Sequence, residues 1–359
     1  MIMRLERWKE IQQSKDVDAV LVSSPANIRY LCGFAGTESY LYLSGKHGVI
    51  LTDSRYTLQA EEESGGLEVR SIAGKRGYGQ LLKELLREDD VGRLGFEDES
   101  MLYRTVRKLQ EEAGISEERW IPLGDALSML RVQKSEEEIE LLAKAEQIGD
   151  AAFSYILGQL APGVTELETA ARLEYFMRSQ GAEDKSFDTI VASGLHSAMP
   201  HAVPTEKRLE PGELVTLDFG CRYHGYCSDM TRTVVIGRAG ERQKELYRIV
   251  LEAQQTALFK LRAGMTGAEA DRTARSVIEK AGYGAYFGHG LGHSVGLEIH
   301  ERPALSPRDE TVLKPGMIVT VEPGIYVPGV GGVRIEDMVV VTETGCRNLT
   351  SSVKELLEL

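Results

Sequence analysis

Apolar positions over roughly the first third of the chain follow two alternating periods. The segment KHGVILTD, residues 46–53, has the short apolar run of a buried strand. The segments GYGQLLKELLRE, residues 77–88, and RTVRKLQEEAG, residues 104–114, instead repeat apolar residues at helical spacing. Strands that alternate with helices are typical of an α/β domain, so this pattern predicts an α/β fold for residues 1–128.

A long amphipathic helix is predicted to open the remainder of the chain. Ser135 is a favourable N-cap, and Glu138 completes a capping box. One apolar stripe follows at helical spacing and consists of Leu141, Ala145, Ile148, Ala152, Ile156 and Leu160. The dipeptide Pro162-Gly163 is expected to end the stripe. The domain boundary is therefore placed just before this helix, which gives a second domain over residues 129–359.

The second domain repeats its own helical pattern. The segment PGVTELETAARLEYFMRSQG, residues 162–181, resembles AGMTGAEADRTARSVIEKAG, residues 263–282. Each copy has a threonine N-cap, Thr165 or Thr266, with a glutamate at the capping-box position. The two copies lie too far apart for a solenoid repeat. They indicate a duplicated domain whose halves face each other across a pseudo-two-fold axis.

The strands of the two copies match more closely and carry acids. LEPGELVTLDFG aligns with LKPGMIVTVEPG, so that Asp218 corresponds to Glu322. A second acid follows in each half, Asp229 in the first and Glu336 in the second. Facing halves would bring four carboxylates to one centre, where they repel one another and their pKa values rise. Two divalent cations would neutralise the four charges, so the duplication predicts a dinuclear metal centre.

A glycine-rich segment, FGHGLGHSVGLEIHERP at residues 287–303, adds histidines to this picture. Its glycines disfavour a helix, so His289 and His293 are not a helical zinc-binding pair. His300 is not part of an HExxH motif, because position 304 is Ala. We expect a tight loop that brings one imidazole to a metal and others to a substrate.

Composition and charge restrict the classes of binding partner and the cellular location expected for the 359-residue chain. Its formal net charge of −13 disfavours nucleic acid and anionic membranes as partners, and a role in solubility alone also accounts for this charge. No apolar run approaches the roughly 18 residues that span a bilayer, and the N-terminus lacks the apolar core of a signal peptide. The four cysteines form no CxxC motif, which fits a cytoplasmic protein in which Cys221 and Cys227 are free thiols.

Four segments resemble the signature segments of the M24 pita-bread metallopeptidases: LDFGCRYHGYCSDMTR, GHGLGHSVG, VTVEPGIY and VRIEDMV. This family includes methionine aminopeptidase, aminopeptidase P, prolidase (Xaa-Pro dipeptidase) and the metal-free creatinase. The resemblance covers residues 135–345 and implies a pita-bread catalytic domain. By similarity the metal ligands are Asp218, Asp229, His293, Glu322 and Glu336. Asp229 and Glu336 would bridge the two ions.

Further segments resemble the proline-specific branch of this family. NIRYLCGFAGTESYLYL and LTDSRYTLQA are similar to the creatinase/prolidase-type N-terminal domain, which methionine aminopeptidases lack. DTIVASGLHSAMPHAVP is similar to the segment that supplies a substrate histidine, here His201. His289 and His300 match two other active-site histidines. Arg334 matches an arginine that supports the site through an acidic partner or through the substrate.

The resemblance implies hydrolysis of Xaa-Pro bonds, with dipeptides as the leading substrates. Aminopeptidase P activity on longer peptides is the close alternative, and a homodimer is implied as well. A metal-free creatinase-like hydrolase and a non-catalytic binding module are disfavoured, because all five ligands are present. Proline specificity has a physical basis, because the imide nitrogen has no N–H for an ordinary peptidase to hold.

The ligand set also suggests the metal and the chemistry. Carboxylate oxygens with a single imidazole suit Mn²⁺, with Co²⁺ or Zn²⁺ as substitutes. Two such ions could hold a bridging water and lower its pKa, and the resulting hydroxide would attack the scissile carbonyl. By analogy with the family, Glu322 accepts the proton and passes it to the leaving nitrogen. His201 and His300 would stabilise the tetrahedral intermediate and orient the substrate.

For several other polar residues, the sequence is also consistent with a role in folding or packing rather than in catalysis. Tyr326, four residues after Glu322, lines the pocket or packs in the core, and the sequence favours neither. Asp53, Arg55 and Tyr56 in the segment TDSRY are expected to stabilise the N-terminal domain's own fold or an interface rather than take part in catalysis. His224 is expected at the surface, in the turn of a hairpin.

Overall fold

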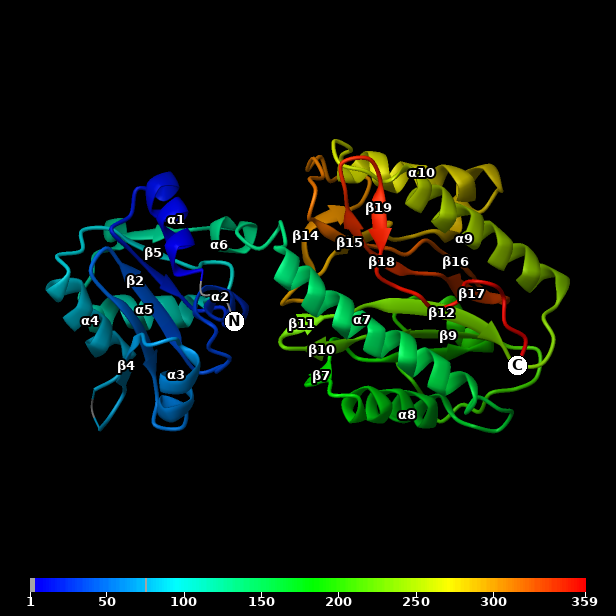
Figure 1. Cartoon of the computed structure of the whole chain (residues 1–359), viewed down its shortest axis with the longest axis horizontal. Coiled ribbons are helices and arrows are strands. Elements are labelled where there is room, and N and C mark those ends of the chain that lie inside the picture. The colour runs from blue at the N-terminus through cyan, green and yellow to red at the C-terminus, as the bar shows by residue number, and fades with distance from the viewer. Residues whose placement is uncertain (1–3, 75) are drawn as a thin grey trace. The chain divides into compact units, whose positions relative to one another are not determined.

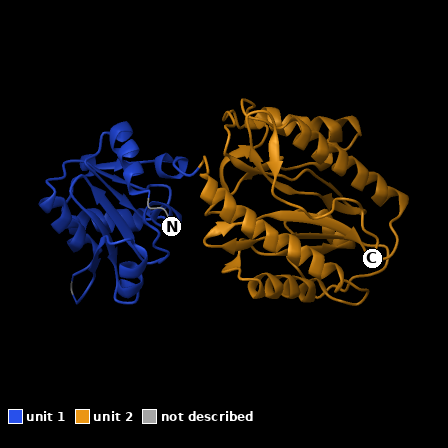
Figure 2. Cartoon of the chain, viewed as in Figure 1, with its two compact units in different colours: residues 1–131 blue, residues 132–359 orange. Residues whose placement is uncertain are grey.

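The computed structural model describes residues 4–74 and 76–359 (Figure 1). The chain separates into two compact units, residues 1–131 and residues 132–359 (Figure 2). Within the described residues, no helix combines the length and the apolar composition needed to cross a bilayer.

Unit 1 is a mixed α/β domain, as the alternating periods predict. Its sheet has the strand order β4-β3-β2-β1-β5-β6, in which β1 pairs antiparallel with β2 and parallel with β5. The strands are β1 (Ala19–Val22), β2 (Tyr40–Ser44), β3 (Gly48–Thr52), β4 (Glu68–Ser71), β5 (Leu94–Phe96) and β6 (Trp120–Pro122). The helices are α1 (Trp8–Lys15), α2 (Pro25–Cys32), α3 (Thr57–Glu63), α4 (Tyr78–Glu88), α5 (Tyr103–Ala113) and α6 (Ala126–Met129). Apolar residues of α4 and α5 pack against β1, β3 and β5 in one core.

Unit 2 contains two similar halves. The first half consists of α7 (Glu136–Leu157), α8 (Glu166–Ser179), β8 (Ile190–Ser193), β9 (Leu214–Phe219) and β12 (Met230–Val235). The second half consists of α9 (Glu241–Lys260), α10 (Gly267–Lys280), β13 (Gly292–Ser294), β14 (Glu301–Leu305), β15 (Ile318–Val321), β18 (Asp337–Val341) and β19 (Cys346–Asn348). Two smaller sheets are formed by β7 (Asp184–Lys185), β10 (Cys221–Tyr223) and β11 (Tyr226–Cys227), and by β16 (Gly324–Val327) and β17 (Gly331–Arg334). In Figure 1, α7 and α8 lie on the side of β9 and β12, and α9 and α10 on the side of β15 and β18.

The helix starts of unit 2 confirm the capping predictions. Ser135, Thr165 and Thr266 each accept a hydrogen bond from the backbone of a glutamate three positions later, and each glutamate completes the box. The end of α7 differs from the prediction, because the helix stops at Leu157 rather than at Pro162-Gly163. Two amides beyond this end bond back to the carbonyl of Ile156, which closes the last turn early.

The apolar stripe of α7 also needs one correction. Leu141 is only half-buried, whereas its neighbour Leu142 is fully buried. Gly149 and Phe153 are also buried on this face, because the helix is covered on a wide arc rather than along a narrow stripe.

The strands place one set of side chains in each core and the other set at the junction of the halves. Val215 and Leu217 of β9 belong to the first core, and Val319 of β15 belongs to the second. Thr216 and Thr320 face the opposite side, as the alternation of a strand requires. The halves are joined across this junction by backbone hydrogen bonds such as Glu336 N to Thr231 O, 3.1 Å.

Candidate metal centre

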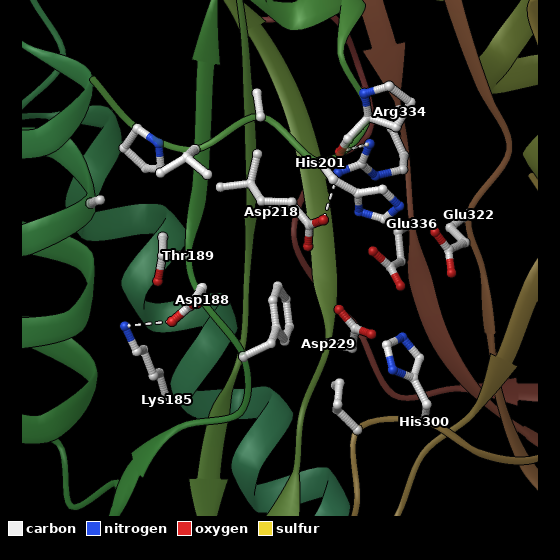
Figure 3. A pocket seen from close by; sticks show the side chains of 18 of the residues that line it. Lys185, Asp188, Thr189, His201, Asp218, Asp229, His300, Glu322, Arg334 and Glu336 are labelled. Atoms are coloured by element: carbon white, nitrogen blue, oxygen red, sulfur yellow. Dashed lines mark hydrogen bonds and ion pairs between the residues drawn. The ribbon is translucent and has the colours of Figure 1, made fainter. Parts of the chain in front are cut away.

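Four acidic side chains converge on one wall of a cavity (Figure 3). Asp218 lies in β9, and Asp229 directly precedes β12. Glu322 directly follows β15, and Glu336 directly precedes β18. Because β9 pairs with β12 and β15 pairs with β18, each antiparallel pair contributes two of the acids. The duplication seen in the sequence is therefore what assembles the cluster.

The predicted ligand atoms lie within coordinating reach of one another. One carboxylate oxygen from each of Asp218, Asp229 and Glu336 lies within 4.8 Å of the other two. His293, from β13, places its Nε2 atom 3.5 Å from Asp229 Oδ2 and 3.4 Å from Glu322 Oε1. The structure thus brings all five predicted ligands to one centre.

Two buried oxygens in the cluster have no partner in the described part of the chain, Asp218 Oδ1 and Glu336 Oε1. The second oxygen of each acid is bonded, since Asp218 Oδ2 accepts from Arg334 and Glu336 Oε2 accepts from Thr231 at 2.7 Å. An unsatisfied buried acceptor costs about 1–3 kcal/mol. Each acid therefore keeps one oxygen for a partner that the protein does not supply, and a divalent cation fits this role.

The electrostatics of the cluster support the same fit. Burial raises the pKa of Asp229 and of Glu336 well above the ordinary range, and neighbouring carboxylates raise both further. Burial also raises the pKa of Glu322 to about 7, an effect that Arg334 opposes and Asp218 reinforces. Carboxyls in this state favour either protons or cations over bare negative charge.

His293 is oriented as a neutral ligand. Its Nδ1 atom lies 3.2 Å from the carbonyl oxygen of Ser294, and burial lowers the pKa of the ring. A proton on Nδ1 that is donated to this carbonyl leaves the Nε2 lone pair directed at the acids. The backbone N–H of His293 donates to Thr320 Oγ1, 3.0 Å, which fixes the base of the side chain.

Arg334 connects the acid cluster to the cavity wall. Its Nη2 atom lies 2.5 Å from Asp218 Oδ2, and its Nη1 atom donates to the hydroxyl of Tyr326 at 2.7 Å. The guanidinium is 3% exposed, so this ion pair is buried. Of the two roles that the sequence left open for Arg334, support through an acidic partner is the one for which the structure provides a contact.

A cavity of about 750 Å³ surrounds the cluster. Its lining includes all five predicted ligands, Arg334 and three histidines, His201, His289 and His300. Every residue predicted to act at the site therefore borders one volume.

Comparison with known proteins places this centre in a family. The model "Metallopeptidase family M24" matches residues 140–343, and the model "Creatinase/Prolidase N-terminal domain" matches residues 4–133. The chain belongs to metallopeptidase family M24. Among curated M24 relatives, the Xaa-Pro dipeptidase of Pyrococcus furiosus is 42% identical, over 99% of this chain and 99% of its own.

Solved structures of M24 proteins share the whole architecture. The Xaa-Pro dipeptidase from Bacillus anthracis is 45% identical, with a TM-score of 0.95 over 99% of each chain. The X-Pro aminopeptidase from Thermotoga maritima is 39% identical, with a TM-score of 0.90 over 98% of this chain and 100% of its own. These likenesses confirm the predicted fold, a creatinase/prolidase-type N-terminal domain followed by a pita-bread domain. Membership of this metallopeptidase family, together with the acidic cluster, implies divalent metal ions as cofactors.

The three cavity histidines of this M24 protein have different surroundings. His201 and His300 are exposed to the cavity, and the His300 ring lies 4.4 Å from that of His293. His289 instead has both nitrogens engaged, since Nδ1 lies 2.8 Å from Gly290 O and Nε2 lies 2.9 Å from the Tyr326 hydroxyl. Burial and the charge of Arg334 lower the pKa of His289 to about 4. His289 is therefore neutral and bonded to the protein.

Sequence reasoning did not assign three hydroxyl groups of the site. Thr231 donates to Glu336, and Thr320 Oγ1 donates to Glu322 Oε1 at 3.1 Å. The Tyr326 hydroxyl links Arg334 to His289. A signal existed for Thr320, which shares a strand face with the acid two positions later. For Tyr326 the sequence suggested a place at the pocket or in the core but not its hydrogen-bond partners, because no period in the chain relates it to Arg334 or to His289.

The other polar residues considered in the sequence analysis do not line this cavity. Cys221 and Cys227 are buried free thiols, and burial raises the pKa of each. Asp53 and Arg55 form an ion pair of 2.6 Å within unit 1. His224 is exposed in the turn between β10 and β11, as predicted.

Proposed function

We propose that this M24 protein is an Xaa-Pro dipeptidase that binds two divalent cations through Asp218, Asp229, His293, Glu322 and Glu336. The observation that carries the proposal is the convergence of four carboxylates and one neutral imidazole on a single cavity, with two buried oxygens left unbonded by the protein. Full-length similarity to proteins named Xaa-Pro dipeptidase supports the substrate.

Manganese is the metal we propose, because carboxylate oxygens with one imidazole suit Mn²⁺, with Co²⁺ or Zn²⁺ as substitutes. When bound, such ions supply a hydroxide at neutral pH and polarise the scissile carbonyl. The protein must hold the metal ligands in place, and for three of the acids a neighbouring side chain does this through a hydrogen bond. Arg334 orients Asp218, Thr231 orients Glu336, and Thr320 orients Glu322.

Glu322 is the proposed proton carrier of the reaction. Thr320 occupies its Oε1 atom, so Oε2 is the oxygen that takes up a proton and returns it to the leaving nitrogen. The side chain is 16% exposed, which leaves it open to the cavity.

The exposed histidines are proposed to contact the substrate. His201 and His300 have imidazoles directed into the cavity, where an N–H donor stabilises negative charge on a tetrahedral intermediate. For His289 we replace direct substrate contact with a supporting role, because Tyr326 and Gly290 occupy its two nitrogens. His289 would then act by holding the Tyr326 hydroxyl against Arg334.

Xaa-Pro aminopeptidase activity on longer peptides is the second candidate. A cavity of about 750 Å³ lies within the range of about 300–1,000 Å³ found for drug-sized ligands, so unit 2 by itself does not limit the substrate to a dipeptide. A structural relative is named X-Pro aminopeptidase, which supports the same candidate.

We also propose a cytoplasmic location and a homodimer. The four cysteines are free thiols, which is typical of a reducing compartment. The dimer rests on the family resemblance, and light scattering of the purified protein would measure it.

A peptide-cleavage assay tests the function. Protein loaded with Mn²⁺ is incubated with an Xaa-Pro dipeptide and with an Xaa-Pro-Yaa tripeptide, and Asp229→Asn serves as the control. Cleavage of the dipeptide by the wild type alone supports the proposal, and preference for the tripeptide would move the assignment to aminopeptidase. Cleavage of neither peptide by fully metallated protein would refute both.

A further inference from the structure

The loop that carries His201, residues 194–205, has little apolar burial to hold it. Its larger apolar side chains are exposed, Leu195 to 64%, Met199 to 52% and Val203, at the cavity, to 74%. An imidazole needs a fixed position to act on a substrate, because misplacement by about 1 Å costs about 100-fold in rate. Polar contacts must therefore fix this loop.

Glu166 binds both ends of the loop. At one end, Oε1 accepts from the N–H and the hydroxyl of Ser193, at 2.7 and 2.8 Å. At the other end, Oε2 accepts from the N–H and the hydroxyl of Thr205, at 3.0 and 2.8 Å. His196, inside the loop, places Nδ1 2.9 Å from Oε2. The side chain is 0% exposed, so one buried carboxylate receives five donors.

These donors keep Glu166 ionised. Burial alone would raise its pKa, but the hydrogen bonds from His196, Thr205 and Ser193 outweigh this and lower the pKa of the carboxyl. Glu166 is also the first residue of α8, where the helix dipole favours a negative charge. Only a carboxylate can accept at all of these positions at once.

The duplicated half contains no counterpart to this contact. Glu166 follows the capping threonine of α8, and the residue in the same position of α10 is Gly267. A Cβ atom at Gly267 would lie 2.3 Å from the carbonyl oxygen of Ala304, so no side chain fits there. The carboxylate is therefore specific to the half whose loop carries His201.

The middle of the loop is tied to the support of the metal centre. Arg334, which holds Asp218, also donates to the carbonyl oxygen of Pro200 at 3.3 Å. The N–H of Gly332 donates to Ser197 Oγ at 2.8 Å, and a Cβ atom on Gly332 would lie 2.1 Å from Ser197 O. With its ends held by Glu166, the loop thus presents His201 at a fixed place relative to the ligands.

We propose that Glu166 is a positioning residue that acts on the reaction through His201, by clamping both ends of the loop at residues 194–205. This inference rests on the proposed function for its substrate. The clamp itself is a structural property that can be measured without any substrate.

The first test measures the loop by hydrogen–deuterium exchange in the full-length, Mn²⁺-loaded protein. Glu166→Gln keeps the size of the side chain but replaces an acceptor oxygen with an NH₂ group that faces other donors. We expect amides of residues 193–205 to exchange about tenfold faster, while peptides of β9 and β18 are unchanged. Glu168→Gln is the matched control, because it lies on the same helix and glutamine can still complete the capping box. Unchanged exchange in the loop of Glu166→Gln would overturn the proposal.

The second test is a double-mutant cycle with an Xaa-Pro dipeptide. We expect Glu166→Gln to lower kcat/KM by about 10- to 100-fold in the wild-type background and by less than about twofold when His201→Ala is already present. His196→Asn keeps a donor near the Nδ1 position and should retain most activity, whereas His196→Leu should not. Equal losses in both His201 backgrounds would show a general structural role and overturn the proposal. A wild type without Xaa-Pro cleavage would refute the proposed function, and the exchange measurement would still decide the clamp.

Discussion

Removing the metal should make the stability of this protein depend on pH through Glu322. Its pKa is about 7 in the folded chain against an ordinary 4.5. The folded chain therefore holds this proton more tightly than the unfolded chain does. The contribution of Glu322 to the free energy of unfolding is constant below pH 4.5, falls as the pH rises from 4.5 to 7, and stays lowered above 7. At about 1.4 kcal/mol per pH unit, the cost reaches about 3 kcal/mol.

Glu322→Gln should remove this cost from the metal-free protein. The variant is expected to match the wild type near pH 4.5 and to exceed its free energy of unfolding by about 3 kcal/mol at pH 8. The substitution also relieves the repulsion that Glu322 exerts on Glu336, which acts in the same direction. The difference between the two proteins reports on Glu322 and on the acids that it repels, because changes elsewhere, such as protonation of His289 in the unfolded chain below pH 6.5, affect both proteins alike.

The measurement is urea unfolding in the presence of a chelator, from pH 5 to pH 8. Helical circular dichroism is the suitable signal, because both tryptophans, Trp8 and Trp120, lie in unit 1 and fluorescence would not report on unit 2. Glu343→Gln, which changes an exposed glutamate of unit 2, is the control. Saturating Mn²⁺ should reverse the order of stability, because only the wild type has the full ligand set. Wild-type and Glu322→Gln curves that stay parallel across this pH range would refute the electrostatic account of the cluster.

Three further substitutions test the packing around the centre. Arg334→Met should lower the free energy of unfolding by about 3–5 kcal/mol, because it leaves a buried charge on Asp218 without its partner. Adding Asp218→Asn should restore part of that loss in thermal unfolding. Losses from the two substitutions that simply add in the double variant would contradict the pairing. Gly220→Ala should lower the free energy of unfolding by at least about 1–3 kcal/mol, because its Cβ atom would lie 1.9 Å from Ser228 O; a wild-type melting temperature would exclude the clash. Tyr326→Phe should cost about 1–3 kcal/mol, because the buried guanidinium and imidazole that the hydroxyl bridges each lose a partner; an unchanged urea midpoint would argue against this bridge.

Much of the fold was accessible from the sequence because the relevant signals are local. A capping box needs only residues three positions apart, and those at Ser135, Thr165 and Thr266 are present as predicted. The end of α7 was missed, because the backbone bonds that close its last turn are not encoded by the proline and glycine farther on. The α/β pattern of unit 1 was readable since strand and helix periods differ.

The candidate site likewise has features that the sequence predicts and features that it does not. Two matching strand segments with an acid at the same position were sufficient to predict a pool of carboxylates, because a duplicated domain repeats its local geometry. Apart from Thr320, which shares a strand face with Glu322, the hydrogen-bond partners of those acids could not be identified from the sequence. Arg334 and Asp218 are 116 positions apart, and no period in the chain relates them.

What the sequence determined by itself is the chemistry of this protein: which residue types occur, on which face of which strand, and in how many copies. The tertiary structure decided which of these residues contact one another and which face the open cavity. It directed His289 to Tyr326 rather than to the open cavity, and it enclosed Glu166 between the two ends of one loop. The physical reason is that hydrogen bonds act over about 3 Å in space, whereas sequence patterns report only spacing along the chain.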